Sequence, residues 1–263
     1  MYVDSHCHLD KIDAEKIGED LPKIIENARQ RQVEHMLCVA VTLEDYESMR
    51  SVVEPFSDVS VSCGIHPLYV EESRTDISEV AEKLYAMASH NDVVAIGETG
   101  LDYFYKPDSK VLQQQHFAAH INVAQRLKKP LIIHTRDARE DTLTLLKQGE
   151  AEQAGGVLHC FTESLEMAKR AIDELDFYIS VSGIASFRNA SELRDVIKAL
   201  PLEKLLIETD SPWLAPVPHR GKQNQPAYVA DVAQCVADIK GLTVEEVAKT
   251  TTTNFYQLFK GVA

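Results

Sequence analysis

Eight short runs rich in β-branched residues alternate along this chain with longer stretches that have the periodicity of helices. The alternation is typical of repeated βα units around a parallel sheet, and eight strands with helices between them fit a closed barrel better than an open sheet. The sequence therefore predicts an α/β fold of the (β/α)8, or TIM barrel, class. The expected strands are Tyr2–Asp4, Met36–Val41, Val59–Gly64, Val93–Gly97, Leu131–His134, Gly156–His159, Phe177–Val181 and Lys204–Glu208.

The length of the chain agrees with this fold, because 263 residues is close to the roughly 250 of a typical α/β barrel. No Gly/Ser-rich linker or abrupt change in composition divides the sequence, so we expect one domain over residues 1–263. Ser211 to Pro226 is a long proline-rich connection, a feature typical of functional or disordered loops. Beyond it, 227–240 and 243–259 have helical patterns and should complete the outer ring.

The charge of the chain limits its partners. It has 27 Lys and Arg against 41 Asp and Glu, a net charge of −14, which disfavours nucleic-acid binding by broad neutralisation of phosphates. A polyanionic substrate would need local cations, either metal ions or a few Arg and Lys in one cleft. The five cysteines show no disulfide framework and no apolar run is long enough to span a membrane. We therefore expect a cytoplasmic protein without membrane contact, and a monomer is favoured.

His6 and His8 end the first predicted strand. Alternate residues of a strand share a face, so Asp4, His6 and His8 should point the same way, with Cys7 facing outward. Two imidazoles on one face can bind a divalent metal ion. A single His-x-His pair arises easily by chance, so its meaning depends on the rest of the chain.

Further candidate ligands lie at the carboxyl ends of other predicted strands, the face that carries the active site in α/β barrels. They are Glu98, His134, His159 and Asp210. So many imidazoles and carboxylates exceed the needs of one tetrahedral site but suit two ions that share a carboxylate. We expect Glu98 to bridge two ions, the first held also by His6, His8 and Asp210, and the second by His134 and His159.

Two divalent ions about 3.5–4 Å apart can hold a hydroxide between them and stabilise both oxygens of a displacement. Asp210 is the expected acid/base beside this hydroxide, and Glu98 the bridging catalytic carboxylate. A helix cap is the alternative for Asp210, since Asp210-Ser211-Pro212 also has the pattern of one. An imidazole-rich ligand set suits Zn²⁺, Mn²⁺ or iron, so the residues alone leave the identity of the metal open.

Five residues are candidates for binding a substrate phosphate. Arg136 follows His134 by two residues and should face the same mouth, where its guanidinium could bind phosphate; a structural salt bridge is the alternative. His66 ends the third strand and could donate to a phosphate or be satisfied by backbone. Arg220, Lys222 and Asn224 lie in the proline-rich loop and are expected to form a phosphate-facing lid, or else an ordinary solvated loop.

Five segments, in order along almost the whole chain, carry a family resemblance. They are Asp4–Asp10 (DSHCHLD), Gly97–Tyr103 (GETGLDY), His134–Ala138 (HTRDA), His159–Phe161 (HCF) and Glu208–Leu214 (ETDSPWL). The chain resembles the TatD family of metal-dependent deoxyribonucleases, which belongs to the amidohydrolase-like barrels. In the loop Arg220–Pro226 it has Gln225 where the family usually has Glu, so an amide replaces a charge.

The resemblance implies a Mg²⁺-dependent deoxyribonuclease that acts on single-stranded DNA or DNA ends, as a 3′–5′ exonuclease. It also implies the ligand set His6, His8, Glu98, His134, His159 and Asp210. The first alternative is an amidohydrolase-like enzyme that hydrolyses a small ester, amide, lactone or phosphoester, because the fold does not choose the chemistry. The second is a metal-binding module without activity.

Overall fold

The computed structural model describes residues 1–73 and 75–262. Within these residues, eight strands form one parallel sheet in which each strand pairs with its neighbours in sequence. A bridge from Cys7 to Ser211 brings the end of the first strand to the segment after the last. The predicted α/β barrel is therefore confirmed. The strands are β1 Tyr2–Cys7, β2 Val33–Cys38, β3 Val59–Cys63, β4 Val93–Asp102, β5 Leu131–Arg136, β6 Gly156–Leu158, β7 Tyr178–Val181 and β8 Leu205–Ile207.

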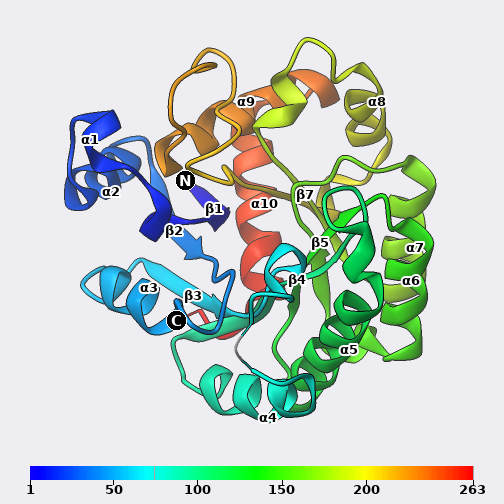
Figure 1. Cartoon of the computed structure of the whole chain (residues 1–263). Helices are drawn as coiled ribbons and strands as arrows, with labels where there is room; N and C mark the ends of the chain where they lie inside the picture. Colours follow the sequence, from blue (N-terminus) through cyan, green and yellow to red (C-terminus); the bar gives the residue numbers. More distant parts are fainter. Residues whose placement is uncertain (74, 263) are drawn as a thin grey trace.

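Helices surround the sheet (Figure 1). They are α1 Ala14–Ile17, α2 Leu21–Gln30, α3 Tyr46–Val53, α4 Ile77–Ala88, α5 Lys110–Leu127, α6 Arg139–Gln148, α7 Leu165–Leu175, α8 Ser191–Ala199, α9 Val229–Lys240 and α10 Val244–Leu258. Short 3-10 helices are η1 Leu9–Lys11, η2 Pro67–Tyr69, η3 Pro107–Ser109, η4 Ala151–Gln153, η5 Gly183–Ser186, η6 Leu202–Lys204 and η7 Pro226–Tyr228. In the described part of the chain, no helix has the length and apolar character needed to cross a membrane.

The strand β4 is longer than the sequence predicted. It continues past Gly97 to Asp102, and its last residue pairs with Arg136 of β5. All ten of its residues are buried, which fits a parallel strand covered on both faces. Glu98 therefore lies inside a strand, where the paired neighbour fixes its position, and not in a loop after it.

The apolar core has two layers because both faces of a parallel sheet are covered. Side chains such as Leu37, Ile132 and Leu206 form one cluster together with Phe255 and Phe259 of the C-terminal region. A second and larger cluster packs the helices against the sheet, with Met36, Ile96 and Ile133 among its members. The strands are thus held rigidly from both sides, and side chains at their carboxyl ends start from fixed positions.

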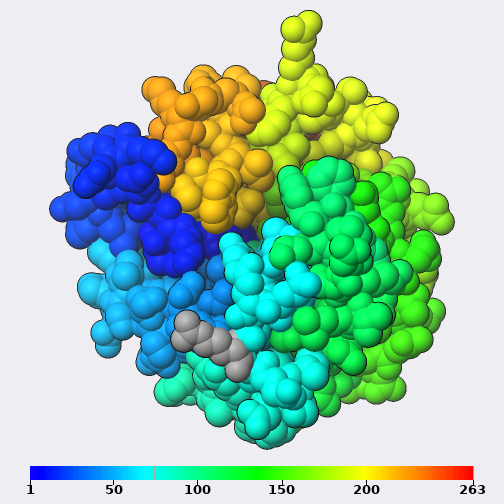
Figure 2. All heavy atoms as spheres, in the orientation of Figure 1, coloured from blue at the N-terminus to red at the C-terminus, as the bar shows by residue number. Residues whose placement is uncertain are grey.

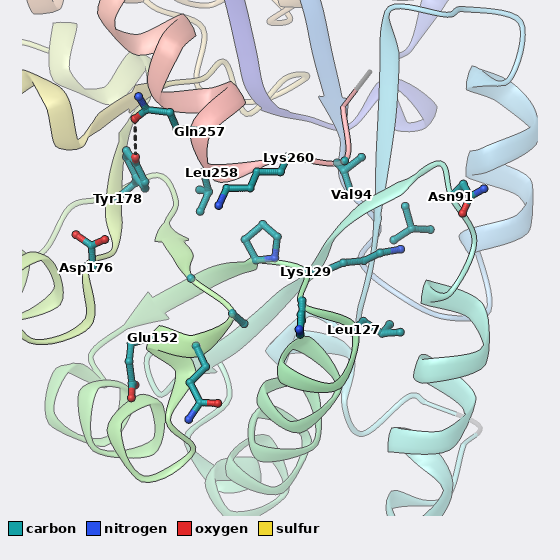
Figure 3. A pocket seen from close by; sticks show the side chains of 17 residues that line it. Asn91, Val94, Leu127, Lys129, Glu152, Asp176, Tyr178, Gln257, Leu258 and Lys260 are labelled. Atoms are coloured by element: carbon teal, nitrogen blue, oxygen red, sulfur yellow. Dashed lines mark hydrogen bonds between the residues drawn. The ribbon is translucent and has the colours of Figure 1, made fainter.

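A cavity of about 800 Å³ lies at the amino ends of β4 to β7. Figure 3 shows its lining, with Leu258 and Lys260 of the C-terminal segment, Val94 near the start of β4, and Tyr178, whose hydroxyl lies 3.4 Å from Gln257 Oε1. The groups of His and Glu that could hold a metal, as far as the described residues go, lie elsewhere. The opposite end of the barrel carries the candidate site. Figure 2 shows segments far apart in the sequence, coloured blue, cyan, green and orange, meeting near the middle of the face it presents.

Candidate metal centre

The carboxylate of Glu98 lies at the centre of a buried cluster of imidazoles. Its Oε2 lies 3.4 Å from His6 Nε2 and 3.9 Å from His8 Nε2. Its Oε1 lies 2.7 Å from His159 Nε2 and 3.4 Å from His134 Nδ1. Oε2 therefore lies toward His6 and His8, and Oε1 lies toward His159 and His134.

Asp210 completes the first group. Its Oδ1 lies 3.4 Å from His8 Nε2 and 3.7 Å from His6 Nε2, and the two Nε2 atoms are 3.1 Å apart. Asp210 follows β8, whereas the histidines belong to the end of β1, so the fold brings these atoms together across about 200 residues of chain. With Glu98 Oε2, four potential donor atoms surround one small space.

His66 joins the second group, a placement that the sequence did not predict. Its Nε2 lies 3.1 Å from Glu98 Oε1, and its ring is 4.5 Å from that of His134. These three residues could together hold a metal ion. A hydrogen bond to α5 holds the loop after β3 in place, because His120 Nε2 accepts from the Ile65 N–H at 2.9 Å. The expected phosphate donor is thus buried among the candidate ligands.

Hydrogen bonds outside the cluster fix which nitrogen His8 and His134 present to it. His8 Nδ1 lies 2.9 Å from the carbonyl oxygen of Val39, which can only accept, so Nδ1 donates and Nε2 faces the cluster. His134 Nε2 lies 3.0 Å from Asp102 Oδ2 and leaves Nδ1 toward Glu98. Imidazoles that bind metal ions are typically held in this way through their other nitrogen.

Two glycines allow β4 to approach β5 closely at the site. Gly97 has φ +150° and Gly100 has φ +135°, conformations that side chains with a Cβ rarely adopt. A Cβ at Gly97 would lie 2.7 Å from the carbonyl oxygen of Ile132, and one at Gly100 would lie 2.0 Å from that of His134. Only glycine fits at either position, and the close approach places Glu98 beside His134.

Asp4 connects β1 to the segment after β8. Its carboxylate accepts hydrogen bonds from the N–H and Oγ1 of Thr209, at 2.8 and 2.6 Å. Burial raises the pKa of Asp4 to about 8. Asp4 therefore fastens β1 to the segment that carries Asp210, whose N–H donates to the His6 carbonyl at 2.9 Å.

The charges of the cluster balance one another. Burial alone would raise the pKa of Glu98, but His159 and His66 outweigh it and hold the pKa well below its usual value. Burial likewise opposes the charge of His159, yet Glu98 raises its pKa well above 6.5. His8 outweighs burial in the same way and lowers the pKa of Asp210. The carboxylates are thus ionised beside imidazoles that can carry protons, and a bound cation would replace those protons.

The residues present fit divalent cations. Both ring nitrogens of His159 and Nδ1 of His6 are buried and, among the described residues, make no hydrogen bond. His159 Nε2 is close to Glu98 Oε1 without the alignment of a hydrogen bond. Buried polar atoms are normally paired, so these nitrogens indicate a missing partner. Imidazole with carboxylate suits Zn²⁺ or Mn²⁺, and carboxylate oxygens suit Mg²⁺.

A cavity of about 330 Å³ opens over the cluster. Arg136 is the one Lys or Arg among the described residues that line it, in agreement with its predicted place at the mouth. Its guanidinium lies 4.3 Å from the ring centre of Phe104 and 4.7 Å from that of Tyr105. The guanidinium thus makes cation–π contacts with two rings, whereas the alternative interpretation expected it to form a structural salt bridge.

The three residues of the predicted phosphate-facing lid are absent from the lining of the 330 Å³ cavity. Asn224 is fully buried, and its Nδ2 donates to the carbonyl oxygens of Thr209 and Trp213 at 2.7 and 2.5 Å. Arg220 lies 3.7 Å from the ring centre of Phe187, and Lys222 lines a separate cavity toward α1 and α2. Asn224 thus holds the loop together, and neither Arg220 nor Lys222 lines the 330 Å³ cavity.

Two residues of the site were not predicted from the sequence: Asp102, a partner of His134, and Trp213, which lines the mouth of the cavity. A signal for Asp102 was present, because it lies four residues after Glu98 and so shares its face if the strand continues. Trp213 follows Asp210 by three residues, and its ring lies 5.1 Å from that of His8 in an edge-to-face arrangement.

Known proteins are similar to this chain over nearly its whole length. The metal-dependent hydrolase YcfH of Escherichia coli K12 is 52% identical over 257 residues, which cover 98% of this chain and 95% of that protein. YabD of Bacillus subtilis, also described as a metal-dependent hydrolase, is 38% identical and covers 99% of each chain. The crystal structure of the TatD homologue YjjV from E. coli K12 matches with a TM-score of 0.88 at 29% identity, over 98% of both chains. The sequence model of the family described as TatD related DNase matches residues 3–260. With this match and the cluster around Glu98, the chain belongs to the TatD-related family of metal-dependent hydrolases.

Proposed function

We propose that the protein is a deoxyribonuclease that hydrolyses phosphodiester bonds of single-stranded DNA from the 3′ end. The observation that carries this proposal is the position of Glu98, whose two oxygens face separate ligand groups below a cavity that contains Arg136. A shared carboxylate between two cations suits an in-line displacement at phosphorus. The description of the family as TatD related DNase supports DNA as the substrate.

Two divalent cations, when bound, would supply Lewis acid stabilisation of the phosphoryl group and make water a better nucleophile. His6, His8 and Asp210 would hold one of them and His134 and His159 the other, with Glu98 shared between the groups.

Two side chains would act on the substrate and the water directly. Asp210, whose pKa is lowered by His8 against the effect of burial, is ionised at neutral pH and can accept a proton from the attacking water. Arg136 can bind two non-bridging phosphate oxygens with its planar guanidinium. Because the chain carries a net charge of −14, the positive charges of Arg136 and of the bound cations are needed to hold a phosphodiester.

The variant Asp210→Asn tests this assignment. It keeps the shape of the side chain but removes the proton acceptor, so nucleotide release from a single-stranded oligonucleotide with Mg²⁺ or Mn²⁺ should fall by roughly 100-fold or more. A chelator should abolish the activity. Asp108→Asn, an exposed position in η3, is the matched control and should keep it. Full activity of Asp210→Asn, or after chelation, would refute the mechanism.

Labelled ends test the direction of digestion. A 3′ label should leave first as a mononucleotide, whereas a 5′ label should remain on a chain that shortens progressively. Early release of the 5′ label, or internal fragments, would contradict the 3′–5′ exonuclease.

Hydrolysis of a small ester, amide, lactone or phosphoester is a second candidate, favoured by the size of the cavity. Its volume of about 330 Å³ is near the lower end of the roughly 300–1,000 Å³ of small-molecule sites. The same groups can act on a carbonyl carbon, because the fold does not choose the chemistry. A higher kcat/KM on such a substrate than on any oligonucleotide, measured with the same metal, would decide for this alternative.

A further inference from the structure

Large aromatic side chains stand exposed around the mouth of the 330 Å³ cavity. Trp213 is 51% exposed, Tyr105 58% and Tyr69 38%, and all three line it. Phe104 is 54% exposed and lies edge-to-face with Tyr105, the ring centres 4.8 Å apart. A single exposed apolar side chain is ordinary, but several around one opening mark a binding surface.

The backbone holds Trp213 in place although its ring is exposed. Its N–H donates to the carbonyl oxygen of Asp210 at 3.0 Å, and its own carbonyl accepts from Asn224 Nδ2 at 2.5 Å. The edge-to-face contact with His8 sets the ring directly beside the first ligand group. A rigid aromatic ring binds a flat partner with little loss of conformational entropy.

The turn that carries Phe104 and Tyr105 is fixed by the carboxylate of Asp102. The N–H groups of Phe104 and Tyr105 donate to Asp102 Oδ1 at 3.0 and 2.8 Å, while Asp102 Oδ2 accepts from His134. Both rings also contact the guanidinium of Arg136. The aromatic pair, the cation and a candidate metal ligand therefore keep constant positions relative to one another.

The charge of the protein favours recognition through these rings. Neutralisation of many phosphates would need a row of Lys and Arg side chains. Among the described residues that line the cavity, Arg136 is the one Lys or Arg. Stacking of bases on aromatic side chains provides affinity without such charges and tolerates any base.

We infer that Trp213 on one side, and Phe104 with Tyr105 on the other, stack on unpaired bases that flank the phosphate held by Arg136. The inference rests on the proposed function and specifies how substrate is selected. In a duplex, neighbouring base pairs already cover both faces of an internal base. The site therefore takes nucleic acid with unpaired terminal bases and rejects blunt duplex ends.

The chain contains one tryptophan, so its fluorescence reports on Trp213 alone. The full-length protein with Mg²⁺ is titrated with a phosphorothioate-linked oligothymidylate, which resists hydrolysis. The same backbone with abasic tetrahydrofuran units and a blunt duplex serve as comparisons. We expect saturable quenching by the oligothymidylate and no saturable quenching by the other two.

A set of variants separates stacking from a general structural effect. Tyr105→Ala should raise the Kd for the oligothymidylate by roughly 5- to 150-fold, the range measured for removal of one stacking partner. Tyr105→Phe keeps the ring and should bind like the parent protein. Tyr256→Ala removes another exposed tyrosine, which is 37% exposed and lies on α10. This variant is a control and should leave the Kd unchanged.

Equal quenching by the abasic chain, or no quenching by any oligonucleotide, would overturn the inference. Hydrolysis of unmodified single-stranded DNA is scored separately. Base-dependent quenching without hydrolysis would support stacking and overturn the proposed nuclease. Hydrolysis without quenching would support the nuclease and overturn the stacking of bases on Trp213.

Discussion

Asp102 Oδ2 accepts a hydrogen bond from His134 Nε2 at 3.0 Å, so the other ring nitrogen of His134 faces Glu98. Asp102 Oδ1 accepts from the backbone of Phe104 and Tyr105. Burial opposes the charge of Asp102, but His134 outweighs it and lowers the pKa of this carboxyl. One ionised side chain outside the ligand groups thus orients a ligand and the aromatic turn.

Asp102→Asn should separate these two effects. The amide oxygen can still accept the two backbone N–H groups, but the side chain loses its charge and one of its acceptor oxygens. We expect a loss of roughly 10- to 100-fold in Mn²⁺ affinity or activity, with little change in the free energy of unfolding. Titration calorimetry measures the Kd, with Asp108→Asn as control. Unchanged affinity would show that Asp102 does not orient His134.

Glu98→Gln should remove binding at both ligand groups, because each of them faces one oxygen of this carboxylate. A substitution in one group, such as His8→Gln, should remove only one equivalent. Native mass spectrometry of protein loaded with Mn²⁺ gives the number of bound ions. Two ions bound to Glu98→Gln would contradict a shared carboxylate.

The variant His35→Gln should change how stability depends on pH. Burial lowers the pKa of His35 from 6.5 to about 4, and its Nε2 lies 2.9 Å from Ser60 Oγ. The folded protein keeps this imidazole neutral, whereas the unfolded chain takes up a proton below about pH 6.5. The contribution of His35 is therefore complete above pH 6.5 and is lost as the pH falls toward 4.

Relative to His35→Gln, the parent protein should lose about 1.4 kcal/mol of stability per pH unit in this window. Urea unfolding of both proteins at several pH values between 7 and 4 measures the difference. A difference that stays constant with pH would show that His35 titrates normally in the folded state.

Asn224→Ala should destabilise the loop after β8. It leaves the buried carbonyl oxygen of Thr209 and the partly buried one of Trp213 without their donor, at a cost of about 1–3 kcal/mol. Lys222→Ala, an exposed change in the same loop, should alter the free energy of unfolding by less than about 0.5 kcal/mol. If Lys222→Ala instead weakens oligonucleotide binding and Asn224→Ala does not affect stability, the loop contacts the substrate as first predicted.

Much of the site could be predicted because its residues lie on regular strands. A barrel gathers the carboxyl ends of its strands on one face, so His6, Glu98 and His134 had to meet once the eight strands were recognised. The loop residues Arg220 and Lys222 could not be placed in this way. Their positions depend on particular contacts, such as the stacking of Arg220 on Phe187, which no periodicity records. His66 was found as a candidate, but its place among the ligands depends on His120 in a distant helix.

The tight contact of β4 with β5 at Gly97 and Gly100 also bears on how such a protein can evolve. Neither position tolerates a Cβ, so the strands that carry Glu98 and His134 have almost no freedom to change without loss of the fold. Phe104, Tyr105 and Trp213 project from loops into solvent, where other side chains fit without displacing a neighbour. Mutation can therefore redirect this barrel toward new substrates at its rim while the reactive centre below stays as it is.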